Sequence, residues 1–155
     1  MIVFNRRVRS IDECVRGGSG GLKKGESRGS MSAFSHHLFV CGNQRADGHP
    51  RGCCDPAGSG ELRDCLKKAL KARGLDGQVR ANQAGCLDQC EWGPTLVIYP
   101  QGIWYGGVKI EDVPRIVEET IIGGKVIEEL RIPDQWLNTP EGKAAGKQRR
   151  SDAAR

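Results

Sequence analysis

Four cysteines in loops rich in glycine and polar residues constrain this chain more than any other feature. Twelve residues separate Cys41 from Cys54, and three separate Cys86 from Cys90. Thiolate is a soft ligand that selects zinc, copper(I) or iron–sulfur clusters, and four thiolates are enough for a tetrahedral zinc ion or a two-iron cluster. The pattern therefore predicts loops built around a metal centre and leaves the identity of the metal open.

The apolar pattern around these loops predicts a small mixed β-sheet of the α/β class. Short runs typical of strands lie at residues 37–40, 79–82, 95–99 and 103–105. Helical periodicity covers about 60–73, with Ser59 as a possible cap, and a second stretch that starts between 110 and 114 and ends at Gly123-Gly124. A strand, a crossover helix and a strand form a parallel, right-handed unit, and the turn at 100–102 makes the last two strands a hairpin. The predicted order is β-α-β-β-β-α, which brings both cysteine loops to a common end of the sheet.

Composition divides the chain into a folded middle and two tails. Residues 1–32 form a leader rich in glycine and serine, and residues 138–155 contain no large apolar residue after Asn138. Segments of this kind bury too little surface to offset their ordering entropy, so we expect both to be disordered. The folded domain is predicted over 33–137, and translation starting at Met31 is an alternative.

The net charge of +5 lies in the tails. Residues 1–30 carry seven basic and three acidic side chains, and residues 138–155 carry five and two, which leaves twelve and fourteen for the stretch between. A domain with a net charge of −2 lacks the basic face that nucleic-acid binding requires, so we expect no nucleic-acid partner. Since no stretch approaches the roughly 20 apolar residues of a membrane span, we expect no membrane contact either.

Seven cysteines, an odd number, in a chain without a recognisable secretory signal indicate reduced thiols and a cytoplasmic protein. Cys65 lies on the apolar face of the predicted first helix and is expected to pack in the core, while Cys14 has no assigned role. Cys53 and Cys54 are adjacent, so their side chains point in opposite directions in an extended backbone. The spacing from Cys41 favours Cys54 as the ligand.

Two other interpretations of the cysteines remain open at this point, and a third is disfavoured. A structural zinc site is one, because Cys86 and Cys90 have the close spacing that such sites use. Coincidental loop cysteines are another. Thiol–disulfide catalysis is disfavoured, because the chain has no C-x-x-C motif.

His49 is expected to shape its loop rather than to bind metal, and Trp92 is expected to pack or to shield the centre from water.

Two runs of sequence carry a resemblance to a known family: HLFVCGNQRADGHPRGCCDPAGS and GCLDQCEWGPTLVIYPQGIWYGGV. They are similar to the thioredoxin-like [2Fe–2S] ferredoxins of bacteria, whose motif joins a cysteine after the first strand, a GHP loop with G-x-C, and a later C-x₃-C followed by GP and YP-x-G-x-WYG. The resemblance covers roughly residues 36–132. Cys53 departs from it, because the family usually has serine there.

The resemblance implies a thioredoxin-like fold that lacks that fold's first strand and helix. It also implies a homodimer and one [2Fe–2S] cluster, held by Cys41, Cys54, Cys86 and Cys90. The expected function is that of a one-electron carrier and not an enzyme, with redox partner proteins as donor and acceptor. The alternatives are a structural zinc-binding protein and a cluster-bearing subunit or sensor of a larger redox enzyme.

Overall fold

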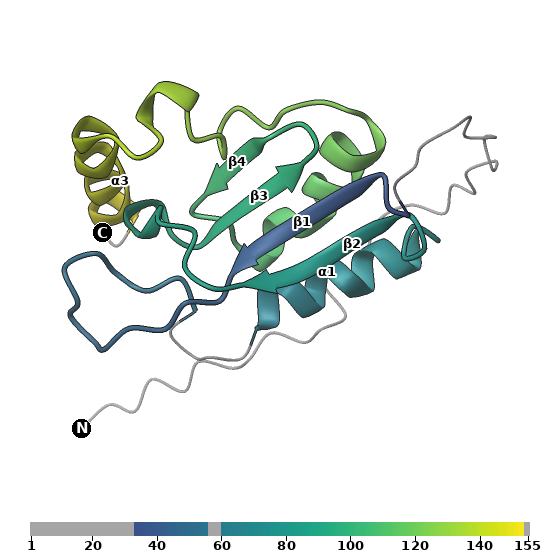
Figure 1. Cartoon of the computed structure of the whole chain (residues 1–155), viewed down its shortest axis with the longest axis horizontal. Helices are drawn as coiled ribbons and strands as arrows, with labels where there is room; N and C mark the ends of the chain where they lie inside the picture. The colour runs from purple at the N-terminus through teal and green to yellow at the C-terminus, as the bar shows by residue number, and fades with distance from the viewer. Residues whose placement is uncertain (1–32, 56–59, 154–155) are drawn as a thin grey trace.

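The structure is a computed structural model that describes residues 33–55 and 60–153. Its centre is a four-stranded mixed sheet in the order β2-β1-β3-β4 (Figure 1). The strands are β1 (His36–Cys41), β2 (Val79–Ala84), β3 (Thr95–Tyr99) and β4 (Ile103–Gly106). All four lie where the sequence predicts them, within two residues at each end.

The pairing of the strands also follows the prediction. β1 runs parallel to β2, and the crossover between them contains α1 (Glu61–Ala72). β3 is antiparallel to both β1 and β4, so the hairpin adds to the free edge of β1. The sheet therefore has the predicted α/β arrangement of a parallel unit extended by an antiparallel hairpin.

One face of the sheet packs against helices and forms the core. Leu38 and Val40 of β1 and Leu96 and Ile98 of β3 alternate toward this face, and all four are buried. α1 contributes the predicted apolar stripe, in which Cys65, Leu66, Ala69 and Leu70 are buried. Cys65 therefore packs in the core as expected, although it is disulfide-bonded rather than a free thiol.

The second predicted helix is a continuous helical stretch made of three segments. These are η3 (Ile110–Asp112), α2 (Val113–Arg115) and η4 (Ile116–Ile122), the last with π-type hydrogen bonding. Its inner face is buried and consists of Val113, Ile116, Val117, Thr120 and Ile121. Thr120 hydrogen-bonds to the buried hydroxyl of Tyr105 at 2.7 Å. Tyr105 also accepts the Ile127 N–H at 3.0 Å, which satisfies a polar group at the centre of the core.

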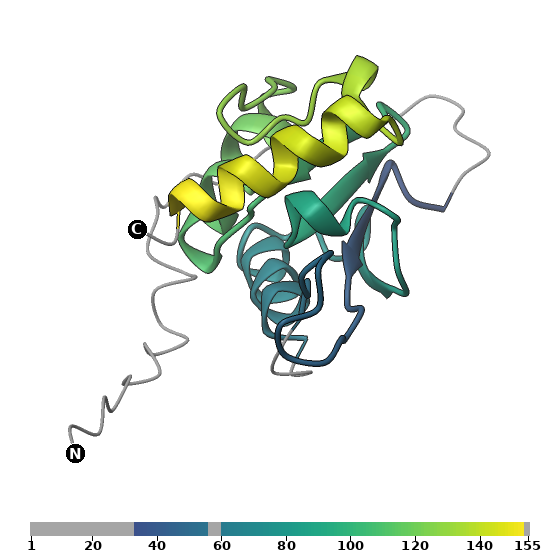
Figure 2. The same ribbon diagram turned by 90° about the vertical axis from the view of Figure 1, so that its left-hand side faces the viewer.

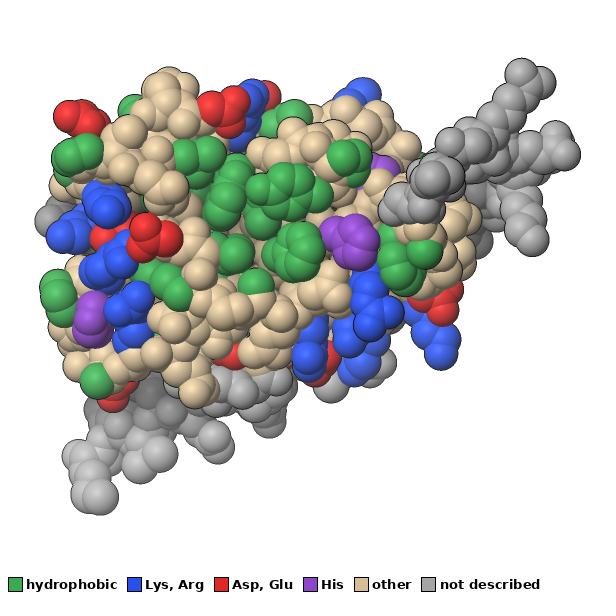
Figure 3. Space-filling model, in the orientation of Figure 1, with side chains coloured by type: hydrophobic (Ala, Val, Ile, Leu, Met, Phe, Trp, Pro, Cys, Tyr) green, Lys and Arg blue, Asp and Glu red, His purple; other side chains and the backbone are tan. Residues whose placement is uncertain are grey.

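The opposite face of the sheet carries a row of apolar side chains. Phe39 pairs with Val97, and Val97 pairs with Trp104, on neighbouring strands. Phe39 also contacts Tyr99, which is the large apolar residue left 45% exposed. Figure 3 shows a patch of hydrophobic side chains on the face of the molecule that is turned toward the viewer in Figure 1. The open face is defined by Phe39, Val97, Tyr99 and Trp104, of which Val97 is only 2% exposed while the three aromatic side chains are partly or largely exposed.

The C-terminal segment differs from the expected disordered tail. After η5 (Asp134–Trp136), residues Pro140–Ala153 form the helix α3, which packs against η2 (Cys90–Trp92). The helix begins with a local cap, because the Gly142 N–H donates to Thr139 Oγ1 at 3.1 Å. The folded unit thus extends past the predicted boundary at Leu137, while the predicted leader, 1–32, lies outside the described residues. No helix in the described part of the chain is long and apolar enough to cross a membrane.

Candidate metal centre

Both cysteine loops start at the same end of the sheet. Cys41 is the last residue of β1 and pairs in parallel with Ala84, the last residue of β2. The chain then continues into the loops that carry Cys54 in one case and Cys86 and Cys90 in the other. Figure 2 looks onto this end of the molecule and shows α3 lying across it. The predicted common location of the two loops is therefore confirmed.

The four cysteines lie as two pairs. Cys86 Sγ and Cys90 Sγ are 3.4 Å apart, and Cys41 and Cys54 hydrogen-bond to each other. Three of the four are buried, and Cys86 is exposed. Within the described residues, no three His, Cys, Asp or Glu side chains form a ready-made site for one metal ion.

Cys53 and Cys54 point to different partners, as their adjacency predicts. Cys54 is 5% exposed, and its Sγ faces Cys41 and lies 3.9 Å from Thr95 Oγ1. Cys53 Sγ instead donates to the Asn43 carbonyl at 3.4 Å and accepts the Arg45 N–H at 3.2 Å. Cys54 is therefore paired with Cys41, whereas the Cys53 side chain contacts only its own loop.

In the Cys41–Cys54 pair, Cys41 is favoured as the thiolate and Cys54 as the thiol that donates to it. The hydrogen bond from the Cys54 thiol lowers the pKa of Cys41 to about 5, although burial of Cys41 acts in the opposite direction. The same hydrogen bond, followed by burial, raises the pKa of Cys54. Since the thiolate is the metal-binding form, the first loop offers one thiolate that is already stabilised.

Backbone N–H groups converge on the sulfurs. Asn43 and Leu87 each donate a backbone hydrogen bond to Cys41, and the Leu87 bond links the first loop to the second. The Asp88 N–H lies 3.4 Å from Cys86 Sγ. Gly93 permits a further close approach, because a Cβ there would lie 2.7 Å from Cys54 Sγ. Such donors stabilise negative charge on sulfur.

Two arginines join the loops in different ways. Arg45 Nη2 lies 3.3 Å from Cys90 Sγ and 3.7 Å from Cys86 Sγ. Arg51 pairs with two carboxylates, Asp88 and the buried Glu91, each at 2.8 Å. Its hydrogen bond lowers the pKa of Asp88. At Glu91 burial is the largest influence and acts to raise the pKa, but the hydrogen bond from Arg51, a backbone hydrogen bond and the charges of Arg51 and Lys143 together lower it.

The helix α3 holds the backbone of both loops from outside. Arg150 Nη1 donates to the carbonyls of Cys90 at 2.7 Å and of Arg51 at 3.3 Å. The helix approaches closely at Gly146, where a Cβ would lie 3.0 Å from the Glu91 backbone and from Trp92. Contacts of this kind leave no apolar periodicity in the sequence, which is why the helix was not predicted.

Trp92 and His49 both make packing or hydrogen-bond contacts in the cysteine loops. Trp92 is 4% exposed and stacks on Trp136, with ring centroids 5.6 Å apart, so it covers the second loop from water. His49 Nδ1 accepts the Arg51 N–H at 3.1 Å, and the His49 carbonyl accepts the Gly52 N–H at 2.8 Å, which closes a turn in the first loop.

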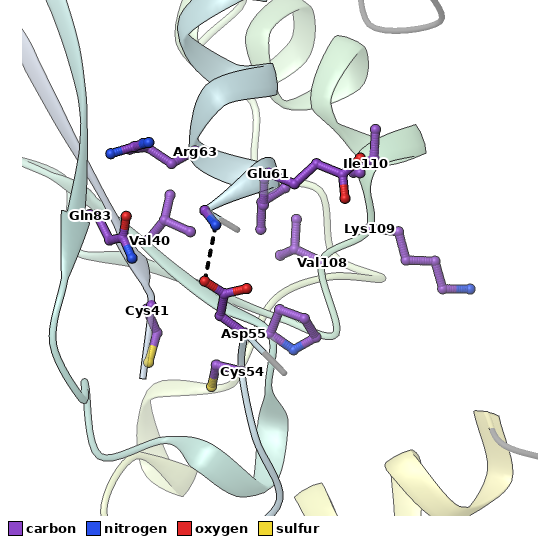
Figure 4. A pocket seen from close by; sticks show the side chains of 14 residues that line it. Val40, Cys41, Cys54, Asp55, Glu61, Arg63, Gln83, Val108, Lys109 and Ile110 are labelled. Atoms are coloured by element: carbon purple, nitrogen blue, oxygen red, sulfur yellow. Dashed lines mark hydrogen bonds between the residues drawn. The ribbon is translucent and has the colours of Figure 1, made fainter. Parts of the chain in front are cut away.

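A cavity of about 240 Å³ opens beside the first pair. Figure 4 shows Cys41 and Cys54 at one side of it, with the Asp55 carboxylate bound to the Gly60 N–H at the start of α1. The hydrogen bond is 3.1 Å long. The cavity is therefore lined in part by the Cys41–Cys54 pair and adjoins the candidate metal centre.

Comparison with known proteins identifies the family. The chain is 40% identical over 97 residues to a 2Fe-2S ferredoxin from Clostridium pasteurianum, covering 63% of this chain and 95% of that protein. It is also 40% identical over 106 residues to a 2Fe-2S ferredoxin from Aquifex aeolicus, covering 66% of this chain and 92% of that protein. The chain belongs to the [2Fe–2S] ferredoxins.

Solved structures place it in the thioredoxin-like branch of that family. The crystal structure of the thioredoxin-like [2Fe–2S] ferredoxin from Aquifex aeolicus superposes with a TM-score of 0.60 at 38% identity, covering 66% of this chain and all of that one. No protein-family model matches the chain. The predicted family and the predicted thioredoxin-like fold are both confirmed.

Proposed function

We propose that this chain is a one-electron carrier whose [2Fe–2S] cluster is held by the thiolates of Cys41, Cys54, Cys86 and Cys90. The observation that carries the proposal is that two cysteine pairs, from two loops, lie at the same end of the sheet. A [2Fe–2S] cluster takes four cysteine thiolates, shared between two irons. The pairs Cys41–Cys54 and Cys86–Cys90 would supply two thiolates to each iron.

The groups around the sulfurs fit an anionic centre. The backbone N–H groups of Asn43, Leu87 and Asp88 already point at cysteine sulfurs. Arg45 Nε is buried and has no hydrogen-bond partner among the described residues, so an anionic group here would provide the missing acceptor. When bound, the cluster supplies a reversible one-electron redox couple.

The exposure of the four cysteines indicates where a redox partner protein approaches. Cys41, Cys54 and Cys90 are buried, whereas Cys86 is exposed at the surface of the second loop. A donor or acceptor docking over Cys86 therefore comes closest to the centre. A carrier, rather than an enzyme, working in the cytoplasm is the function that we propose.

The visible absorption spectrum of the freshly purified protein, with its iron and zinc content, tests this function. A red-brown protein that contains two irons and two sulfides per chain, and that bleaches reversibly on addition of dithionite, is the expected result. A colourless protein with stoichiometric zinc would support the structural zinc alternative instead. Co-purification with catalytic subunits from the native cell would favour the alternative of a subunit in a larger redox enzyme.

We also propose that two copies pair through the open face of Phe39, Val97, Tyr99 and Trp104. The helices cover only the other face of the sheet, and Tyr99 is left 45% exposed within a row of apolar side chains. Aromatic side chains gathered on a sheet face are typical of a protein contact. A symmetric homodimer would cover this patch on both copies.

A further inference from the structure

We propose that Arg45 sets the reduction potential of the centre, by placing its positive charge against the sulfurs of the second cysteine pair. This inference rests on the proposed function, because it concerns the cluster that the four cysteines would hold. Arg45 is then a potential-tuning residue and not a ligand.

The position of the guanidinium carries the inference. Its Nη2 contacts both Cys90 Sγ, at 3.3 Å, and Cys86 Sγ, at 3.7 Å. It reaches these sulfurs from the first loop, so the contact spans 45 residues of sequence to Cys90. The backbone of Arg45 is fixed at the same time, because its N–H donates to Cys53 Sγ at 3.2 Å.

Arg45 differs from Arg51 in having no ion pair with a carboxylate in the described part of the chain, although the more distant Asp88 carboxylate feels its charge. Arg51 is instead paired with Asp88 and Glu91. Arg150 of α3 donates to the carbonyls of Cys90 and Arg51 rather than to a sulfur. Among the described residues, Arg45 is therefore the cation whose side chain contacts the sulfurs.

The direction of the effect follows from electrostatics. Uptake of one electron from a redox partner adds one unit of negative charge at the site and neither makes nor breaks a bond. A positive charge in contact with the sulfurs favours the more negative state, more strongly than it would in water because Cys90 and the Arg45 Nε atom are buried. Arg45 thus raises the reduction potential.

The test compares the midpoint potentials of the wild-type holoprotein and three variants in a redox titration followed by visible absorption. Arg45→Gln is expected to lower the equilibrium constant for reduction about tenfold, which is a shift of about 59 mV to more negative potential for a one-electron couple. Arg45→Lys keeps the charge and is expected to shift the potential less. Arg115→Gln is the matched control, since it removes the same charge from an arginine that is paired with Glu119 on the second helical stretch.

Each outcome decides the proposal. Equal shifts in Arg45→Gln and Arg115→Gln would reduce the effect to net charge and overturn it, as would an unchanged potential in a fully coloured Arg45→Gln protein. Loss of the cluster from both Arg45 variants, with the fold intact by circular dichroism, would overturn it in favour of a role in cluster assembly. A wild-type protein without an iron–sulfur spectrum would instead refute the proposed function itself.

Discussion

Two neighbouring cysteines in the first loop have different surroundings, and the difference assigns their roles. Cys54 faces Cys41 and is buried, whereas Cys53 is bonded to the Asn43 carbonyl and the Arg45 N–H. We therefore predict that Cys54→Ala loses the cluster, while Cys53→Ser keeps it, because a serine hydroxyl can replace both loop contacts of Cys53. The visible spectrum and the iron content of the two purified variants measure this.

The reverse result would show that the ligand assignment is wrong. A bleached Cys53→Ser protein beside a coloured Cys54→Ala protein would mean that the loop rearranges on cluster binding and presents Cys53 instead. Cys53→Ala serves as a second control, since it removes the thiol without offering a hydroxyl.

At the level of residues, spacing predicted the cysteines but not their neighbours. The candidate cysteines, which are Cys41, Cys54, Cys86 and Cys90, could be predicted from the sequence because they lie in the two loops that follow predicted strands and because their spacing is distinctive. Arg45 could not be linked to Cys90 in this way. Its contact depends on how a loop of fourteen residues, 42–55, folds back, and no local pattern encodes that path.

Among the elements, α3 is the one whose importance the composition conceals. Arg150 in α3 donates to the carbonyls of Cys90 and Arg51, one in each loop. We predict that Arg150→Gln releases cluster faster than wild type when a chelator is added. Each lost charged hydrogen bond is worth about 1.5 kcal/mol, which is roughly a tenfold effect on a rate. The decay of visible absorbance gives the rates.

Lys147→Gln provides the matched control on the same helix. Lys147 is exposed, so the variant changes the charge of α3 by the same amount without touching either loop. Equal release from both variants would show that α3 does not hold the cysteine loops. A chain ending at Leu137 should behave like Arg150→Gln or worse, because it lacks the whole helix.

The strands could be predicted and α3 could not, for one physical reason. Strands and core helices show their position through apolar periodicity, as Leu38 and Val40 do in β1. α3 packs through glycines and arginines, so its contact face looks like a solvated tail. The one available signal was Thr139-Pro140, a cap and a first-turn proline followed by good helix formers.

At the scale of the whole molecule, the open face predicts the oligomeric state. Tyr99→Lys places a charge in the proposed contact and should weaken dimerisation about tenfold or more, since about 1.4 kcal/mol suffices for that factor and an unpaired buried charge costs more. Light scattering on a dilution series, after gel filtration, measures the equilibrium. The substitution should leave the packing of Phe39, Val97 and Trp104 in each copy unchanged.

Asp76→Asn is the control for this experiment. It makes the same change in charge at an exposed position in the turn between α1 and β2, away from the open face. If wild type stays monomeric at the highest concentrations, or if Tyr99→Lys dimerises as well as Asp76→Asn, the open face has another use.

The docking of α3 also determines where an added domain would sit. The Arg150 side chain donates to the Cys90 carbonyl, and Ala153, the last described residue, follows Arg150 by about one turn of α3 (Figure 1). The end of the described chain is therefore close to the cysteine loops. A reductase joined there by a short flexible linker would meet the loops at an effective concentration of roughly millimolar. A single polypeptide that couples reductase and carrier could therefore be made by fusion at this terminus, with no new interface required.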